Sequence, residues 1–414
     1  MSARRPVRPL AEPFRALLRS PVTGGPLTWA GPHLLSDGDT LWPCPDGIPY
    51  LRTGRDGLRA RAVDALRAGE ADRALALLLC DRKDDAVPPA DPARALDVAT
   101  GATTAAAAMA GLGYGGLAPY FLHRWCQPTY LSGLALLDAH APTGTTLFET
   151  ACGAGHFLRT WTQRCGPAIG SDLVFSHLWI ARTFCAPDAD LVCFDADGAF
   201  PLVDGAAGTA LSHDSFHYFR DKRHVLAELL RVSGAGPVLL GHVHNADHAH
   251  YSPGLPLTAD GYRELLAPDH SYDDEALTGS ALGALPGPTG AAVDGGRPAG
   301  TASYRGQPKG ANTAAAALAF VFRAAGQPAT PGRLTAPVPG RPLHVNPLLT
   351  DDGPRWPDEQ FAREFADDWP YLRDLSRPSP ATVAAARAGR AGSDPDVDRA
   401  ARRRALVDLP ESWL

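Results

Sequence analysis

An acid followed by a turn of small residues is the most chemically informative feature of this sequence. Residues 145–150 resemble a short apolar strand that carries Glu149 near its end, and residues 151–155 (Ala-Cys-Gly-Ala-Gly) form a tight turn before a helical segment. Glycine at positions 153 and 155 lets a ligand approach the backbone where a Cβ would collide, and the helix start offers free N–H groups. This order predicts a nucleotide-sized site at the carboxyl end of a parallel strand.

The details of the turn exclude two common phosphate-binding motifs. A dinucleotide fingerprint needs a third glycine near position 158, where this chain has Leu158. A P-loop needs a lysine at the end of the turn, but the only lysines are Lys83, Lys222 and Lys309. Because Glu149 would repel a phosphate, the turn favours a ligand that carries positive charge and hydroxyl groups.

Two further acids follow at equal spacing. Asp172 stands 23 residues after Glu149 at the end of a short apolar run, and Asp195 stands 23 residues after Asp172 at the end of another. A helical pattern separates each pair, which predicts βαβ units with right-handed crossovers. The three acids should therefore line one edge of a parallel sheet. Asp172 also suits a helix N-cap, a role compatible with ligand binding.

The segment from about Tyr120 to Asn245 resembles the core of class I S-adenosylmethionine (SAM) dependent methyltransferases. The family pattern at the first strand is an acid and a glycine-rich turn, which stands here as residues 149–155 with Glu for the commoner Asp and Ala151 for the first glycine. The resemblance implies an α/β fold with a Rossmann-like, mostly parallel sheet and helices on both faces. It also implies SAM as the cofactor and S-adenosylhomocysteine as the product.

The resemblance further assigns roles to individual residues. Glu149 is expected near the amino end of the methionine moiety, Asp172 at the ribose hydroxyls, and Asp195 beside the adenine. The complete set of expected cofactor-binding residues is Glu149, Ala151, Cys152, Gly153, Gly155, Asp172, Leu173, Asp195, Ala196 and Ser212.

The residues after the fourth expected strand (208–212) are the candidates for chemistry. Methyl transfer from a sulfonium is an in-line displacement, so the enzyme mainly positions the nucleophile and excludes water. A base is needed only if the acceptor must lose a proton. The candidates are His213, Asp214, His217 and Tyr218, with His217 the first choice as base or substrate orienter; a role as pocket wall is the structural alternative.

A second group of histidines lies near the end of the fifth expected strand (237–244). It comprises His242, His244, His248 and His250. Imidazole suits zinc, iron or nickel, but the spacing matches no known metal motif, and strand-end histidines often only form hydrogen bonds. We therefore predict no metal.

Composition narrows the class of protein. The formal net charge is −6, and basic clusters are limited to Arg4-Arg5 and 402–404, which disfavours a nucleic-acid substrate. The seven cysteines include no CxxC pair, so reduced thiols are expected. No segment resembles a signal peptide or a membrane span. These features predict a cytoplasmic protein, monomeric or homodimeric, and the abundance of Arg over Lys with frequent Ala suggests a GC-rich bacterial genome.

The remaining sequence suggests four regions. Residues 1–56 resemble the small zinc-ribbon-like module of some methyltransferases and of tRNA-methyltransferase activators, but only Cys44 remains of its cysteines, so a metal-free β-rich module is expected. Residues 57–140 show helical periodicity. Residues 141–325 form the SAM-binding core, with a Gly/Pro-rich insertion near 281–310 and a last antiparallel edge strand within 312–323. Residues 326–414 form an irregular extension, with 381–407 as a surface helix or frayed tail.

These observations lead to one main hypothesis and two alternatives. The main hypothesis is a methyltransferase that acts on a small molecule or peptide, in bacterial specialised metabolism such as natural product biosynthesis. The first alternative is an RNA base methyltransferase. The second is a SAM-binding protein that transfers no methyl group, such as a scaffold or a cyclase.

Overall fold

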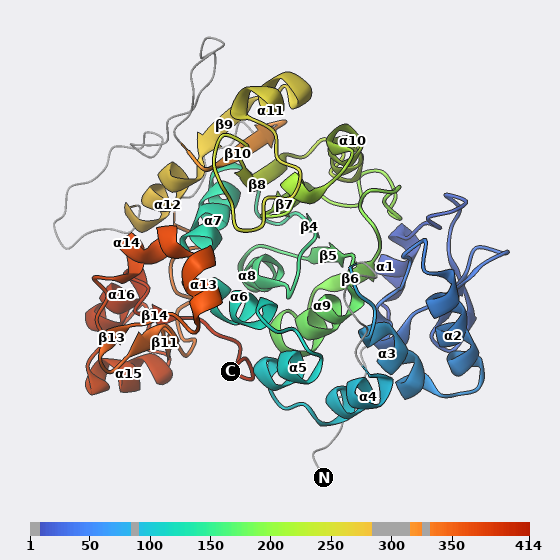
Figure 1. The fold of residues 1–414 in the computed structure, drawn as a ribbon, viewed down its shortest axis with the longest axis horizontal. Helices are drawn as coiled ribbons and strands as arrows, with labels where there is room; N and C mark the ends of the chain where they lie inside the picture. Colours follow the sequence, from blue (N-terminus) through green and yellow to red (C-terminus); the bar gives the residue numbers. More distant parts are fainter. Residues whose placement is uncertain (1–8, 84–90, 284–314, 325–331) are drawn as a thin grey trace.

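A seven-stranded sheet forms the centre of the protein, seen in a computed structural model that describes residues 9–83, 91–283, 315–324 and 332–414 (Figure 1). The strand order is β6-β5-β4-β7-β8-β10-β9; the first five are mutually parallel, and β10 is antiparallel to both of its neighbours. The strands are β4 (Leu147–Thr150), β5 (Ala168–Asp172), β6 (Asp190–Cys193), β7 (Thr209–His213), β8 (Val238–His244), β9 (His270–Asp273) and β10 (Ala317–Phe322). The predicted Rossmann-like α/β class is confirmed.

Both faces of this sheet are buried. Alternate side chains of a strand enter different clusters: Leu147 packs in one and Phe148 in the other. The first cluster includes residues of α7 (Pro128–His140), α8 (His156–Arg164) and α9 (Phe175–Ile180). The second includes residues of α10 (Lys222–Val232) and α11 (Ala259–Leu266). Burial on both sides explains why β10, with the sequence Ala-Leu-Ala-Phe-Val-Phe, is continuously apolar.

The strand order reverses between β4 and β7, and we call the region at the carboxyl ends of these strands the crevice. From β4 the chain builds β5 and β6 on one side, then crosses back to build β7 and β8 on the other side. In open α/β sheets this reversal leaves a crevice in which ligands bind. The residues that end β4, β5 and β6 therefore face one half of the crevice, and those that end β7 and β8 face the other half.

One expectation about the sheet is wrong. We expected residues 312–323 to form the antiparallel edge strand, but β10 lies between β8 and β9, and β9 is the edge. The sequence of β9, His-Ser-Tyr-Asp, is too short and polar to stand out. Most of the expected insertion at 281–310 lies outside the described residues.

The N-terminal module is a three-stranded antiparallel sheet that follows α1 (Glu12–Leu17). Its strands are β1 (Thr28–Gly31), β2 (Leu34–Ser36) and β3 (Leu41–Pro43). Ser20, where the resemblance places a cysteine, accepts hydrogen bonds from the backbone N–H groups of Val22 and Thr23, each at 3.2 Å, and is hydrogen-bonded to Asp37. These bonds hold the turn between α1 and β1.

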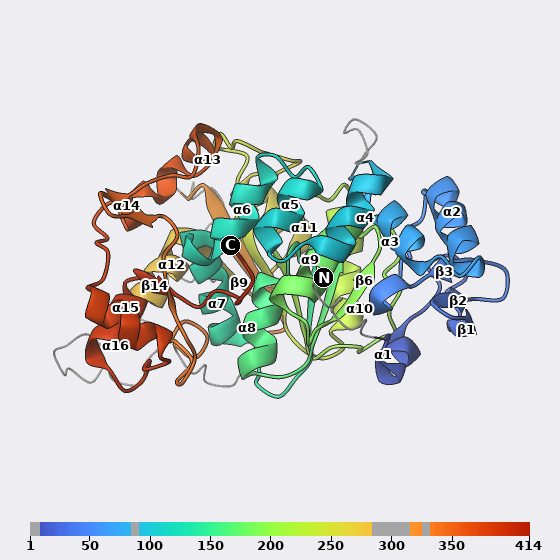
Figure 2. The same cartoon turned by 90° about the horizontal axis from the view of Figure 1, so that it is seen from below.

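The end of this module extends the main sheet. The backbone N–H of Leu51 donates to the carbonyl of Cys193 at 2.7 Å, and the N–H of Cys193 donates to that of Pro49 at 2.9 Å. The module is therefore attached at the β6 edge. Figure 2 shows it at one end of the molecule and the C-terminal extension at the other.

Several helices stand between the N-terminal module and β4. Those before α7 are α2 (Asp56–Arg67), α3 (Ala71–Leu79), α4 (Pro92–Gly101), α5 (Ala105–Gly111) and α6 (Leu117–His123), and a 3-10 turn, Arg124–Cys126, follows α6. Helix α12 (Asp274–Gly283) packs on α7. Within the described residues no helix is long and apolar enough to cross a membrane.

The C-terminal extension is more ordered than we expected. It contains α13 (Glu359–Glu364), α14 (Trp369–Leu372), α15 (Pro380–Arg387) and α16 (Pro395–Arg402), with the short strands β11 (His344–Val345), β12 (Leu349–Thr350), β13 (Gly353–Pro354) and β14 (Leu406–Val407). The alternative of a frayed tail over 381–407 is wrong because α15, α16 and β14 share a buried cluster. Trp413, fully buried, donates from Nε1 to the carbonyl of Leu122 at 3.0 Å.

Candidate functional site

The turn after β4 has the backbone conformation that its glycines predict. Ala151, Gly153 and Gly155 have φ angles of +54°, +53° and +84°, so every second residue is left-handed. A Cβ at Gly153 would lie 2.7 Å from the ring of Phe121, which leaves no room for a side chain. Ala151 keeps the glycine-like conformation although it has a Cβ, so it stores strain at the site.

We expect Ala151→Gly to stabilise the protein. A left-handed conformation costs an L-residue roughly 1–2 kcal/mol, part of which the greater freedom of glycine in the unfolded chain offsets. The net gain should be about 1 kcal/mol, measured from urea unfolding midpoints. As a control, Ala106→Gly in the regular helix α5 should destabilise the protein by up to about 1 kcal/mol. A loss of stability in both variants would contradict the inference that the backbone at Ala151 is strained.

Glu149 is buried at the centre of the crevice. Its side chain is only 3 % exposed, and its Oε2 has no hydrogen-bond partner among the described residues. Burial raises the pKa of this carboxyl well above its usual value; Arg124 opposes the rise and Asp172 adds to it. A buried carboxyl oxygen without a partner fits a ligand that brings a cationic donor group.

Asp172 is held ionised at the end of β5. It accepts hydrogen bonds from the backbone N–H groups of Gly153 (2.9 Å) and Val174 (2.8 Å), and its Oδ1 lies 3.2 Å from Nδ1 of His177. Burial alone would raise its pKa, but His177 and the two N–H groups hold that pKa below its usual value. The bond from Val174 holds Asp172 close to the start of α9, but the N-cap interpretation is wrong, because Val174 itself occupies the N-cap position and no side chain caps this helix.

The other expected cofactor residues lie along the same edge. Asp195 follows β6 and binds the backbone N–H of Asp197 at 3.0 Å; Ala196 beside it is buried. Leu173 directly follows Asp172, and its carbonyl accepts a hydrogen bond from Arg52 of the N-terminal module at 3.3 Å. Cys152 is a buried thiol. Ser212 lies across the crevice, with its hydroxyl 2.8 Å from that of Ser215.

An aromatic cluster closes over the turn. The ring of Phe121 lies 5.0 Å from that of His177, and Tyr114 lies 6.1 Å from Phe121 and 5.6 Å from His177. Because Phe121 contacts the backbone at Gly153, a ligand at this turn must lie beside Phe121 or displace it. Phe121 and Tyr114 therefore form the wall of the candidate cofactor site, which sequence reasoning did not identify.

Asp214 is the centre of the other half of the crevice. Its Oδ2 accepts a hydrogen bond from the hydroxyl of Tyr120 at 3.0 Å and lies 3.0 Å from the guanidinium of Arg124, which is buried. Its backbone is left-handed, with φ +54°. Burial opposes ionisation, but Arg124 and His242 outweigh burial and hold the pKa of Asp214 far below its usual range.

Three buried histidines surround this carboxylate. Burial lowers the pKa of His213 to about 3, of His217 to about 2 and of His244 to about 4, so all three are neutral near pH 7. The rings of His217 and His244 stack with centroids 3.6 Å apart. His213 lies deeper, and one ring nitrogen is 2.8 Å from the carbonyl of Thr129.

His217 and Tyr218, our first choices for the chemistry, lie beside Asp214. The Nδ1 of His217 accepts a hydrogen bond from the backbone N–H of His244 at 3.4 Å, which places the proton of the neutral ring on Nε2. Nε2 is buried and has no partner among the described residues. This tautomer suits the role of substrate orienter. The hydroxyl of Tyr218 donates to Ser252, so it is already engaged. The chemical roles of both residues stay predictions.

The same cluster offers ligand atoms for a metal ion. One donor atom each from Asp214, His217 and His244 lie within 4.8 Å of one another. A coordinating imidazole nitrogen must carry no proton, whereas the free Nε2 of His217 carries one in the tautomer above. Two donors already occupy Oδ2 of Asp214. We therefore assign no metal here.

Several residues of this half come from segments that the sequence did not connect to it. Tyr120 and Arg124 precede β4, His242 lies within β8, Asp274 begins α12 and Asp368 comes from the C-terminal extension. Burial raises the pKa of Asp368 to about 7, although His242 and Arg124 lower it. The mixture of polar and aromatic residues over 120–130 was the only signal for the first two.

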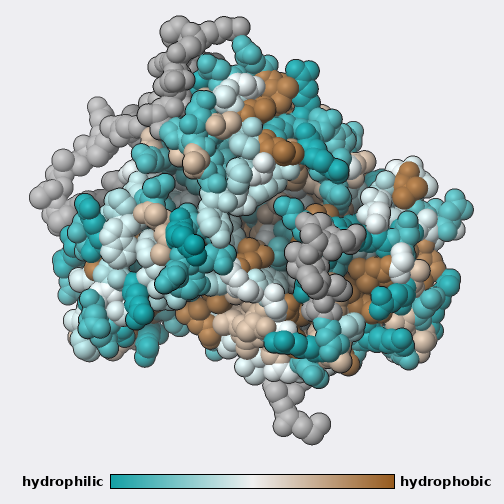
Figure 3. Space-filling model, viewed as in Figure 1, coloured by the Kyte–Doolittle hydropathy of each residue, from teal (hydrophilic) through white to brown (hydrophobic). Residues whose placement is uncertain are grey.

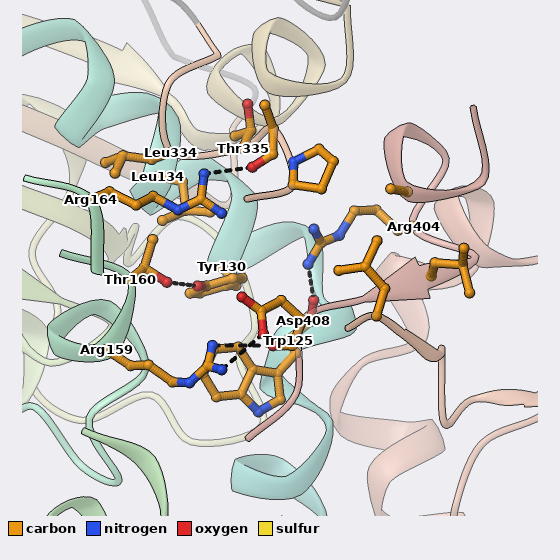
Figure 4. A pocket seen from close by; sticks show the side chains of 15 residues that line it. Trp125, Tyr130, Leu134, Arg159, Thr160, Arg164, Leu334, Thr335, Arg404 and Asp408 are labelled. Carbon is orange, nitrogen blue, oxygen red and sulfur yellow. Dashed lines mark hydrogen bonds and ion pairs between the residues drawn. The ribbon is translucent and has the colours of Figure 1, made fainter. Parts of the chain in front are cut away.

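Figure 4 shows a separate cavity where the C-terminal extension meets α7 and α8. Arg159 pairs with Asp408 at 2.8 Å, and Arg404 donates to the carbonyl of Trp125. The cavity measures about 30 Å³, which is room for about two water molecules and far less than a substrate needs. Its arginines therefore dock the extension onto the core.

The face shown in Figure 3 is mostly hydrophilic, with apolar residues in small separate patches. Exposed large apolar side chains include Tyr251 and Leu255, in the loop between β8 and α11, and Trp369 of α14. Scattered residues of this kind are normal on protein surfaces.

Comparison with known proteins identifies the central segment. Residues 148–240 match the family model described as "Methyltransferase domain". Solved structures with a similar core include the [4+2]-cyclase SpnF, which is 21 % identical over 36 % of this chain and 61 % of that chain, with a TM-score of 0.32. A TehB-like SAM-dependent methyltransferase from Corynebacterium glutamicum is 20 % identical over 34 % of this chain and 76 % of that chain, with a TM-score of 0.28. The YcgJ protein from Bacillus subtilis is 15 % identical over 37 % of this chain and 77 % of that chain, with a TM-score of 0.30. No curated protein matched the sequence.

Proposed function

We propose that this chain, whose residues 148–240 match a methyltransferase domain, is a class I SAM-dependent methyltransferase that acts on a small molecule or a peptide. The observation that carries the proposal is the crevice between β4 and β7. One half presents Glu149, Asp172 and Asp195 around a left-handed turn, and the other half presents a buried cluster of histidines and carboxylates.

The first half has the donors and acceptors that SAM requires. The orphaned Oε2 of Glu149 suits the ammonium group, and the ionised Asp172 suits the ribose hydroxyls. When bound, SAM supplies an electrophilic methyl group on a sulfonium. The residues of the chain position the acceptor in line with this methyl group and exclude water.

The second half favours an acceptor that is not a nucleic acid. Asp214, Asp274 and Asp368 bring three carboxyl groups to this site, where Arg124 and, when protonated, His242 oppose their charge. Such a site repels phosphates and attracts hydroxyl or amine groups. RNA binding that weakens steeply with salt would instead favour an RNA substrate.

Donor binding is tested by Asp172→Asn. We expect the affinity for S-adenosylhomocysteine, measured by calorimetry, to fall about 10-fold or more, because a hydrogen bond to a charged group contributes roughly 1.5–3 kcal/mol. The control Asp188→Asn changes an exposed carboxylate and should leave the affinity unchanged. No binding to the wild-type protein would refute the proposed function itself.

Methyl transfer is tested by mixing the protein and SAM with a cell extract as the source of acceptor. Formation of S-adenosylhomocysteine above the extract alone supports a transferase. Tight donor binding without this product would favour the scaffold or cyclase alternative.

A further inference from the structure

A β-bulge in β8 turns His242 toward the half of the crevice that contains Asp214 and the buried histidines, which we call the acceptor half. The half that contains Glu149 is the donor half. In the pairing of β10 with β8, Leu318 pairs with Val243 and Phe320 pairs with Leu240. Two residues of β8, Gly241 and His242, therefore lie opposite a single residue of β10. Leu240 and Val243 consequently reach the same buried cluster, although they are three positions apart. Bulges are common beside active sites, where they redirect a side chain.

The backbone at this bulge is strained. His242 has φ +49°, a left-handed conformation that non-glycine residues rarely adopt. Its neighbour Gly241 has no space for a side chain, because a Cβ there would lie 2.2 Å from Nδ1 of His213. Strain of this kind persists where the surrounding structure imposes it, and it concentrates at functional sites.

Asp274 fixes the orientation and the tautomer of His242. Its Oδ2 lies 2.9 Å from Nδ1 of His242, and it is the first residue of α12, where a negative charge is favourable. Because an ionised carboxylate only accepts hydrogen bonds, Nδ1 carries the proton. Nε2 is then left with a free lone pair, which is the arrangement that activates a histidine as a base.

His242 also differs from the other histidines of the cluster. Its side chain is 22 % exposed, whereas His213, His217 and His244 are buried. Burial would lower the pKa of His242, but Asp274 and Asp214 outweigh burial and raise it. The charged and titratable groups around its ring include Asp274, Asp214, Arg124, His213, His217, His244, His250 and Asp368.

We propose that His242, oriented by Asp274, is the general base that deprotonates the methyl acceptor. This inference rests on the proposed function. The acceptor then carries an O–H or N–H group: Nε2 of His242 takes its proton, the lone pair of the acceptor forms the bond to the methyl carbon, and the electrons of the breaking C–S bond remain on sulfur. Asp274 is the positioning residue that stabilises the resulting imidazolium, which later loses its proton to water.

The central test is His242→Asn in the full-length protein. Asparagine tolerates a left-handed backbone, and its amide can still donate to Asp274, but it has no Nε2. With the small-molecule fraction of a cell extract as acceptor source, we expect product formation from SAM to fall 100- to 10,000-fold, with unchanged affinity for S-adenosylhomocysteine. Activity within twofold of wild type would overturn the proposal.

A matched control is His33→Asn. His33 also has a left-handed backbone, φ +60°, but lies in the turn between β1 and β2 of the N-terminal module. Its substitution should change neither activity nor donor affinity. A wild-type protein that binds no donor would instead refute the proposed function.

Two readouts test the dyad directly. Activity should rise with pH through the pKa of His242, above 6.5, because only the neutral ring accepts a proton, and Asp274→Asn should move this rise to lower pH. Nitrogen NMR of labelled histidine, which needs no substrate, should show the proton of neutral His242 on Nδ1. A proton on Nε2, or an activity profile that Asp274→Asn does not move, would overturn the proposal.

Discussion

Replacing Glu149 with glutamine is expected to weaken donor binding roughly 10- to 150-fold and, at the same time, to stabilise the ligand-free protein. The loss of affinity follows from removing a charge-assisted hydrogen bond worth about 1.5–3 kcal/mol. The gain in stability follows because Glu149 is buried with Oε2 unpartnered and with a pKa raised mainly by that burial. Calorimetry with S-adenosylhomocysteine and chemical unfolding measure the two effects.

The sign of the stability effect depends on pH. A carboxyl whose folded-state pKa is raised binds a proton in the folded protein at pH values where the unfolded chain has lost it. The wild-type protein therefore loses stability as pH rises from the unfolded value, about 4.3, through the folded pKa of Glu149, whereas Glu149→Gln does not. Below pH 4 the two proteins should be equally stable; above the window the variant should be more stable by about 1–3 kcal/mol.

Donor binding should show the complementary trend. A cationic ligand favours the ionised carboxylate, so the wild-type affinity should increase with pH through the pKa of Glu149 while that of Glu149→Gln stays flat over the same range. Glu70→Gln, which changes an exposed carboxylate, is the control. Equal affinities of the wild type and Glu149→Gln would remove Glu149 from the donor site.

The positions of Glu149, Asp172 and Asp195 at one edge of the sheet were predictable because their signals are local. Each acid lies within two residues of the end of a short strand, and the turn that begins at Ala151 lies within one stretch of chain. Strand–helix alternation then fixes which edge of the sheet these residues share. The N-terminal β-module was predictable for the same reason, because its turns carry their own residue signature.

The acceptor half depends on contacts between distant segments. Arg124 forms an ion pair with Asp214, which lies 90 positions later in the sequence, and His242 pairs with Asp274, which lies 32 positions later. The bulge that redirects His242 arises from the pairing of β8 with β10, which no pattern within β8 reveals. The packing of Trp413 against Trp125 was equally unpredictable, because Trp125 lies 288 positions earlier in the sequence.

Arg124→Met is expected to destabilise the protein by about 3–5 kcal/mol, the usual result of leaving a buried charge without its partner. The side chain of Arg124 is 4 % exposed, and that of Asp214 is 14 % exposed. Chemical unfolding at pH 7 measures the loss. As a control, Arg73→Met removes an exposed ion pair with Glu70 and should cost less than about 1 kcal/mol.

The pH dependence distinguishes this ion pair from general packing. Asp214 has a depressed pKa in the folded protein, so it contributes stability above its unfolded pKa, about 3.9, and this contribution is lost as pH falls through the folded value. Arg124→Met should raise the pKa of Asp214, so the stability difference from wild type should narrow as pH falls through the variant's Asp214 pKa toward the lower wild-type pKa. A difference that stays constant with pH would mean that Arg124 acts only through packing.

Arg124 should also connect the two halves of the site. Its charge lowers the pKa of Glu149 as well as that of Asp214, so Arg124→Met should move the pH-dependent rise in donor affinity to higher pH. Adding Asp214→Asn removes the unpaired carboxylate, and asparagine tolerates the left-handed backbone there. The double variant should therefore recover stability but keep the shifted donor profile, because the effect on Glu149 does not pass through Asp214. Recovery of both properties would show that Arg124 reaches the donor half only through its ion pair.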